Sequence, residues 1–164
     1  MITEPDLTGD ERAQLNGFLN LLRDAVLRKS DGLTDEQARR RLVPSELTTI
    51  AGLLGHLCYV ESYWFAVVLD GRPDPWAAAL TEDGDAEFRR AMDIPLVRLR
   101  AEYERQCRLS REIAAKLDLA DEVPFRDGRK VNLRYVLIHL IEETGRHAGH
   151  LDLLRELIDG RTGE

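Results

Sequence analysis

Apolar residues recur at intervals of three and four along most of this chain, a spacing that predicts amphipathic α-helices. Four stretches carry the pattern, and they lie at residues 15–26, 53–67, 99–117 and 136–154. Each is longer than a typical β-strand. The chain is therefore expected to be helical almost throughout, with no convincing strand and no internal repeat.

Residues that favour helix ends bound these stretches. The expected N-caps are Thr8, then Ser45 or Thr48, and finally Asn132. Pro95, after Asp93, is the expected first residue of the third long helix. The expected stops are Gly32, Gly71 and Gly160. Between the first two helices, the sequence from Thr34 to Gln37 has the form of a capping box, which predicts an additional short helix.

Two long connections join the later helices. Residues 71–94 are rich in Asp, Gly and Pro and are expected to be partly irregular, with about one turn of helix near Pro75–Leu80. Residues 118–131 contain a turn signal at Asp127-Gly128. Four helices with long connections predict one all-α domain over residues 1–164, a four-helix bundle with at least one crossover connection.

The amino-acid composition and net charge indicate which classes of protein and partner are expected. Of 164 residues, 43% are hydrophobic and 32% are charged, which suits a globular domain. The formal net charge of −7 argues against a nucleic-acid or anionic-membrane partner. We find no signal peptide at the acidic N-terminus and no segment that we expect to span a bilayer, so a cytoplasmic location is expected. Cys58 and Cys107 lie in helical stretches and are expected to be free, buried thiols.

The histidines are concentrated in one place. Three of the four, His139, His147 and His150, lie in the last helical stretch, and Glu143 precedes His147 by one turn. Helical spacing places Glu143 and His147 in the apolar seam of that helix. His56 lies in the seam of the second long helix, the other strongly apolar stretch.

Polar groups in apolar seams cost free energy unless a partner satisfies them. One interpretation is that each is hydrogen-bonded to a neighbour, and for His139 alone this is the preferred one. The other is a divalent metal ion held between facing helices of the bundle by His and Glu side chains. Glu61 and Glu142 are expected to face solvent, and Tyr59, Tyr63 and Trp64 either pack in the core or line a pocket beside His56.

Two segments resemble a known family. Leu54-Gly-His-Leu57 with Val60-Glu-Ser-Tyr-Trp-Phe65 is similar to the second helix of the DinB/YfiT-like superfamily, and Ile138-His-Leu-Ile-Glu-Glu-Thr-Gly-Arg-His-Ala-Gly-His-Leu-Asp-Leu-Leu-Arg-Glu156 is similar to its last helix. The likeness is strongest to an actinobacterial branch of small DinB-like proteins called mini-circle proteins or mycothiol S-transferases, and it covers essentially the whole chain.

The resemblance implies a four-helix bundle with one divalent metal ion held by three side chains, here His56, Glu143 and His147. Zinc and nickel both suit this ligand set. His150 would lie beside the ligands or line the pocket. The Glu and His pair resembles that of the mycothiol-dependent maleylpyruvate isomerases, but we expect the chain to lack their additional C-terminal domain, which argues against isomerase activity.

The implied function is metal-dependent S-transfer of a low-molecular-weight thiol such as mycothiol to an electrophile, with no catalytic residue beyond the metal ligands. Tyr63 and Trp64 would wall the electrophile pocket. Two rival functions remain open, a helical bundle that binds a partner without catalysis and a metal-assisted hydrolase. A homodimer is expected because family members often pair and because residues 64–76 contain many apolar residues expected to be exposed.

Overall fold

The computed structural model describes residues 4–162. The predictions of an acidic N-terminus and of a single domain also cover residues 1–3, 163 and 164, which lie outside this range. The long helices are α1 (Glu11–Lys29), α3 (Ile50–Glu61), α6 (Leu96–Ala114) and α7 (Leu133–Asp159). A π-helix, η1 (Ser62–Leu69), continues α3. The shorter helical elements are α2 (Asp35–Ala38), α4 (Ala77–Glu82), α5 (Ala86–Asp93) and the 3₁₀ turn η2 (Arg126–Gly128). The prediction of an all-α fold is confirmed.

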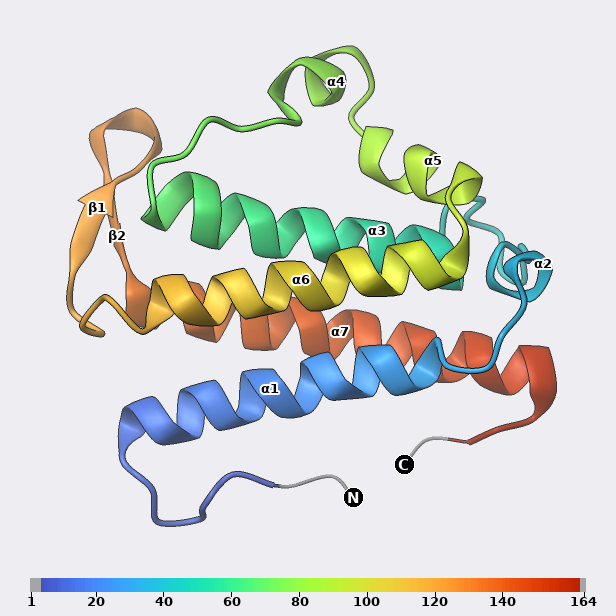
Figure 1. Ribbon diagram of the computed structural model, residues 1–164, viewed down its shortest axis with the longest axis horizontal. Helices are drawn as coiled ribbons and strands as arrows, with labels where there is room; N and C mark the ends of the chain where they lie inside the picture. Colours follow the sequence, from blue (N-terminus) through green and yellow to red (C-terminus); the bar gives the residue numbers. More distant parts are fainter. Residues whose placement is uncertain (1–3, 163–164) are drawn as a thin grey trace.

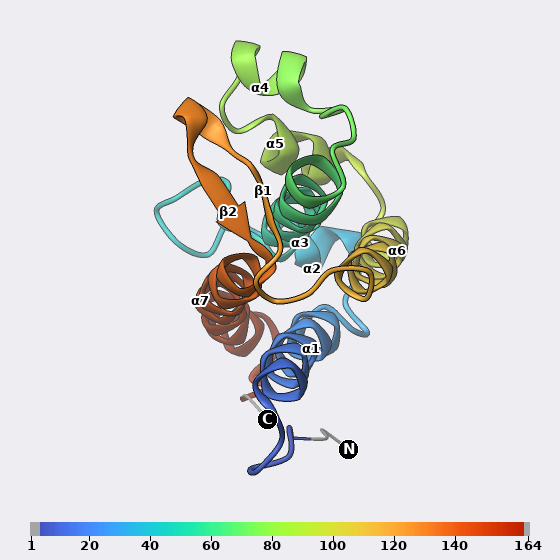
Figure 2. The same ribbon diagram turned by 90° about the vertical axis from the view of Figure 1, so that its left-hand side faces the viewer.

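The four long helices pack side by side (Figures 1 and 2). Helices α1 and α7 run in one direction, and α3 and α6 run in the opposite one (Figure 1). Because α3 and α6 are parallel neighbours, the chain between them has to return along the length of the molecule. Residues 70–95 make this crossover and carry α4 and α5 across the outer face of α3 (Figure 2).

Side chains cap the helices close to the expected positions. Asp10, not Thr8, accepts a hydrogen bond from the first turn of α1, and Thr49, not Ser45 or Thr48, does so for α3. The capping box at Thr34 is present, Asn132 caps α7, and Gly160 ends α7 with a φ of 76°. The pattern therefore located these helix ends to within a few residues.

Helix α5 was not predicted, since residues 86–93 were expected to be irregular. Eight residues are too few for apolar periodicity to stand out. Tertiary packing explains the helix, because α5 approaches α3 at two glycines. A Cβ at Gly55 would lie 2.6 Å from Cβ of Ala91, and a Cβ at Gly52 would lie 3.3 Å from the ring of Phe88.

Two further predictions need correction. The connection after α6 forms a short antiparallel hairpin of β1 (Glu122–Pro124) and β2 (Lys130–Asn132), with Val123 opposite Val131, where no strand was expected. Asp127 and Gly128, the predicted turn, have φ values of 61° and 72°. The second long helix is not α-helical to its end, because in η1 the backbone bonds reach five residues back, as from Asp70 to Phe65.

The membrane prediction is also corrected in one respect. Residues Ile50–Leu69 are long and apolar enough to cross a bilayer by length and composition, although no such segment was expected. Within the molecule, 56% of this window is buried. A buried core helix passes the same test, so the finding is weak evidence for a membrane span.

The core has two apolar clusters with a polar layer between them. One cluster packs Leu53 and Leu57 of α3 against Leu151 and Leu154 of α7, and the other surrounds Leu137 and Leu140 near the hairpin. Between them, each long helix contributes one buried polar side chain, and these are Arg23, Glu61, Ser110 and Thr144. Glu61 was expected to face solvent, but it is fully buried and accepts two hydrogen bonds from Arg23, both at 2.7 Å.

The apolar residues that were expected to form a dimer surface are not exposed as predicted. No large apolar side chain of residues 64–76 is exposed in the structure. The large apolar side chains that are exposed in the described residues are Leu7, Phe18, Val97, Tyr135, Ile138, Leu153 and Leu157.

Candidate metal centre

Helices α3 and α7 bring His56, Glu143 and His147 together at the level of the polar layer. Oε1 of Glu143 lies 3.2 Å from Nε2 of His56 and 3.2 Å from Nε2 of His147. One ligand atom from each residue lies within 4.8 Å of the others, which is close enough to surround one metal ion. The three residues named from the sequence therefore converge, although His56 precedes Glu143 by 87 positions along the chain.

The cluster is partly open to solvent. The side chains of His56, Glu143 and His147 are 17%, 14% and 12% exposed. The sequence placed Glu143 and His147 in the centre of the seam, but the buried positions of α7 at this level are Thr144 and Ala148. Glu143 and His147 therefore lie at the edge of the seam, where their side chains remain partly exposed to solvent.

The surroundings favour the protonation states that a metal ion requires. Burial acts to raise the pKa of Glu143, but the hydrogen bond with His56 and the nearby charges of His147, His56 and Arg146 together lower it. Burial, followed by the charge of His56, lowers the pKa of His147. A carboxylate and a neutral imidazole are the forms in which these side chains bind metal ions.

Glu87 is the residue at this site that sequence reasoning missed. Its Oε1 lies 3.0 Å from Nδ1 of His56, and the ring of Phe88 stacks on the same imidazole at 4.5 Å with an interplanar angle of 16°. Both residues belong to α5, the helix that the pattern did not reveal. The sequence did offer one signal for this contact. An acidic residue is followed directly by an aromatic one in the segment that has to cross over α3.

The remaining histidines have different neighbours. His150 lies beside His147, with 3.3 Å between their Nδ1 atoms. His139 lies away from the cluster of ligand atoms and contacts the rings of Trp64 and Tyr135, with ring centroids 4.8 and 6.1 Å apart. The expectation that His139 is hydrogen-bonded to a neighbour is wrong within residues 4–162, because its ring packs against these aromatic rings instead.

Tyr63 and Trp64 follow His56 along the same helical segment. Trp64 is partly buried and stacks on Phe125 of the hairpin loop, with ring centroids 5.4 Å apart. The Arg126 guanidinium lies 5.2 Å from the centroid of the Tyr63 ring. Their expected role as a pocket wall stays a prediction.

A cavity of about 780 Å³ lies between α3, α5 and α6 under the crossover. Its lining includes Glu87, Cys58, Tyr59 and Trp76 but none of the three candidate ligands. The three candidate ligands therefore do not line the cavity, but Glu87, which contacts His56, does.

The two thiols are not part of the site chemistry. Cys58 and Cys107 form no disulfide, and burial, the largest cause, raises the pKa of each to about 12. At neutral pH both are protonated and weak nucleophiles. Cys107 agrees with the expectation of a free, buried thiol, whereas Cys58 is free but only partly buried.

The donor set fits a divalent metal ion. Two imidazole nitrogens and one carboxylate oxygen face a common point, and His56 cannot donate to both Glu143 and Glu87, because a neutral imidazole has one N–H. Such a set of three protein ligands with access from outside is typical of catalytic zinc sites, whereas closed sites of four ligands are structural.

Comparisons with known proteins identify the family and the fold of the chain. A family model described as Mycothiol-S-transferase matches residues 14–160. A solved structure, the crystal structure of the mycothiol-dependent maleylpyruvate isomerase, superposes with a TM-score of 0.62 at 18% identity, over 84% of this chain and 58% of that chain. The chain thus spans less than two thirds of that protein, and the likeness shows a shared fold. No curated protein matches the chain.

Proposed function

The chain belongs to the mycothiol-S-transferase family, as its resemblance predicted, and we propose that it transfers a mycothiol-type thiol to an electrophile in a metal-dependent reaction. The observation that carries the proposal is the convergence of His56 Nε2, Glu143 Oε1 and His147 Nε2 at a partly open site. These are metal-binding groups in a chain of a family named for thiol transfer.

In this proposal His56, Glu143 and His147 hold the ion. Zinc or nickel, the expected ions, would lower the pKa of a thiol at the site and so supply the thiolate. Glu143 contributes the single negative charge of the ligand set, so a divalent ion keeps net positive charge. His150 accepts or donates the hydrogen bond at Nδ1 of His147 and so holds the second ligand ring in place.

The transfer itself is a substitution at the electrophile. The S–H bond of the thiol and the bond to the leaving group break, the new S–C bond forms, and the proton leaves with the leaving group. The protein supplies no nucleophile of its own, because Cys58 and Cys107 are held protonated by burial, which raises the pKa of each. This distinguishes the proposal from catalysis by a protein thiolate.

We also propose which side chains face the two substrates. Arg146 is exposed and lies 3.7 Å from Glu143, so it can meet polar groups of the thiol, although its hydrogen bond to Glu142 competes for it. Tyr63, beneath the Arg126 guanidinium, and Trp64 are proposed to face the electrophile. From the sequence alone, we also propose a cytoplasmic location and a homodimer.

The test is a thiol-consumption assay with mycothiol and monochlorobimane as the electrophile. Rates should fall to background when a chelator removes the metal and return when zinc or nickel is restored. His147→Ala should remain inactive after metal is added, whereas Glu156→Gln, at an exposed carboxylate on the same helix, should retain activity. Rates that are independent of metal would contradict the proposal and would favour a binding role without catalysis.

A further inference from the structure

The imidazole ring of His56 lies between two carboxylates. Oε1 of Glu87 is 3.0 Å from Nδ1, and Oε1 of Glu143 is 3.2 Å from Nε2. A neutral ring carries one N–H, so only one carboxylate can receive it. The choice matters, because Nε2 binds a metal ion only when the proton is on Nδ1.

Glu87 depends on His56 more than Glu143 does. The Glu87 side chain is 5% exposed, its Oε2 is buried without a hydrogen-bond partner, and His56 is its one ion-pair partner among residues 4–162. Glu143 is more exposed and also faces His147 and Arg146. Leaving a buried acceptor without a donor is more costly than leaving an exposed one, so the proton is held on Nδ1.

Helix α5 fixes the ring as well as its proton. Phe88, the residue after Glu87, stacks on the face of the His56 imidazole at 4.5 Å. The helix can approach this closely because Gly55 has no side chain, since a Cβ there would lie 3.0 Å from the backbone oxygen of Glu87. One turn of α5 therefore contacts both the edge and the face of the same imidazole.

We propose that Glu87 is a positioning residue of the metal centre, which holds the His56 proton on Nδ1 and leaves Nε2 directed at Glu143 and His147. The inference rests on the proposed metal site. Carboxylates that accept the N–H of a metal-binding histidine fix its tautomer and increase its basicity, and their loss typically lowers metal affinity about 10–100-fold.

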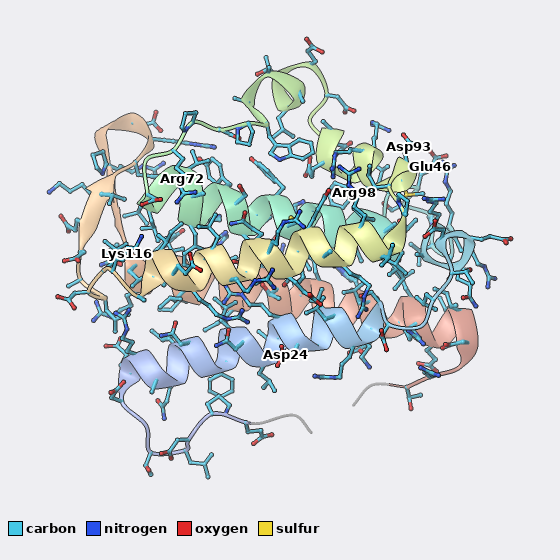
Figure 3. All side chains as sticks on the ribbon, viewed as in Figure 1. Asp24, Glu46, Arg72, Asp93, Arg98 and Lys116 are labelled. Carbon is cyan, nitrogen blue, oxygen red and sulfur yellow. The ribbon has the colours of Figure 1, made fainter. Side chains whose placement is uncertain are left out.

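Two variants and a control test the role of Glu87. Glu87→Ala removes the acceptor, and Glu87→Gln keeps a neutral acceptor of the same length. Asp93→Asn is the matched control, because Asp93 is an exposed carboxylate at the end of the same helix (Figure 3), and its side chain makes no hydrogen bond within residues 4–162. Thermal unfolding of all three, in the absence of metal, shows whether α5 remains packed.

The first measurement uses the full chain without metal. Long-range ¹H–¹⁵N correlation spectra at about pH 8.5, where an ordinary imidazole is neutral, report which ring nitrogen of His56 carries the proton. The proton should be on Nδ1 in the parent chain, in Glu87→Gln and in Asp93→Asn. Glu87→Ala should show a mixture of tautomers.

The second measurement is Zn²⁺ affinity, determined by competition with a chromophoric chelator. Glu87→Ala should bind about 10–100-fold more weakly than the parent chain, Glu87→Gln should lose less, and Asp93→Asn should be unchanged. A purely structural role would lower the unfolding temperature of Glu87→Ala without changing the tautomer or the affinity, and that result would overturn the proposal.

The two measurements separate this inference from the proposed function. A parent chain that binds no zinc would overturn the metal proposal, and the tautomer of the metal-free protein would still decide the role of Glu87. A His56 proton found on Nε2 in the metal-free parent chain would overturn the role of Glu87 even if zinc binds tightly.

Discussion

Glu61 and Glu143 are both carboxylates at the middle of the bundle, but their surroundings differ. The Glu61 side chain is 1% exposed, and each of its oxygens accepts a hydrogen bond from Arg23 at 2.7 Å. The Glu143 side chain is 14% exposed, and one oxygen faces two imidazole nitrogens at 3.2 Å. The first carboxylate is fully paired by one cation, and the second shares one oxygen among groups that also bind metal ions.

The comparison shows that a polar residue in an apolar seam does not by itself mark a functional site. Burial acts to lower the pKa of the Arg23 guanidinium, but the facing Glu61 carboxylate raises it well above its usual range, so the pair stays ionised. Its donors and acceptors are matched, and no bound ion is needed. The cluster at His56 combines mismatched hydrogen bonds with access from solvent, and both features favour a ligand.

The largest expected effect on stability is at Glu61. Glu61→Gln leaves the Arg23 charge buried without a counter-charge, and we expect the free energy of unfolding to fall by about 3–5 kcal/mol. Urea unfolding followed by circular dichroism measures the change. Metal content should be unchanged, and a loss below about 1 kcal/mol, as for an exposed pair, would show that the pair is not buried in solution.

A smaller effect is expected at Gly55, where α5 packs on α3. In Gly55→Ala the new Cβ would lie 2.6 Å from Cβ of Ala91, so α5 has to shift. Overpacking of this kind typically costs about 1–3 kcal/mol. Thermal unfolding gives the stability, and Gly145→Ala is the control, because a Cβ there would have ordinary contacts with Leu22. Equal stability of the two variants would contradict the close packing.

Glu143→Gln should have little effect on stability, in contrast to the same substitution at Glu61. A partly exposed ion pair contributes about 1 kcal/mol or less, so the unfolding curve should nearly overlap that of the parent chain. Zinc affinity should nevertheless fall, because an amide oxygen is a weaker ligand than a carboxylate. An unfolding loss as large as that of Glu61→Gln would mean that the two carboxylates play the same structural role.

The smallest expected effect is at the cysteines. The pKa of Cys58 and of Cys107 is raised to about 12 by burial, so the folded state holds each thiol proton more tightly than the unfolded chain does. The two protonated thiols therefore contribute to the stability of the folded state below pH 9.0, their ordinary pKa. This contribution is lost as the pH rises from 9.0 towards 12. Iodoacetamide should barely label the folded protein at about pH 8, and a Cys58→Ala, Cys107→Ala double variant should keep its transferase rate. Rapid labelling without unfolding would show that a thiolate is available.

Periodicity was sufficient to predict the long helices and the two ligand-bearing seams, because the four long helices bury continuous apolar stripes. It could not reveal α5, because eight residues packed on Gly52 and Gly55 acquire their helical structure from tertiary contact. Glu87 was missed for the same reason. Glu61 was misplaced because a buried ion pair depends on Arg23, a residue 38 positions away, and no local pattern links the two.

Metal retention tests most directly whether His56, Glu143 and His147 bind one divalent ion. The parent chain and a His56→Ala, His147→Ala double variant are loaded with zinc or nickel, freed of excess metal by gel filtration, and analysed by mass spectrometry for metal per chain. We expect one ion per chain in the parent protein and none in the folded double variant. Stoichiometric metal retained by the double variant would contradict this expectation.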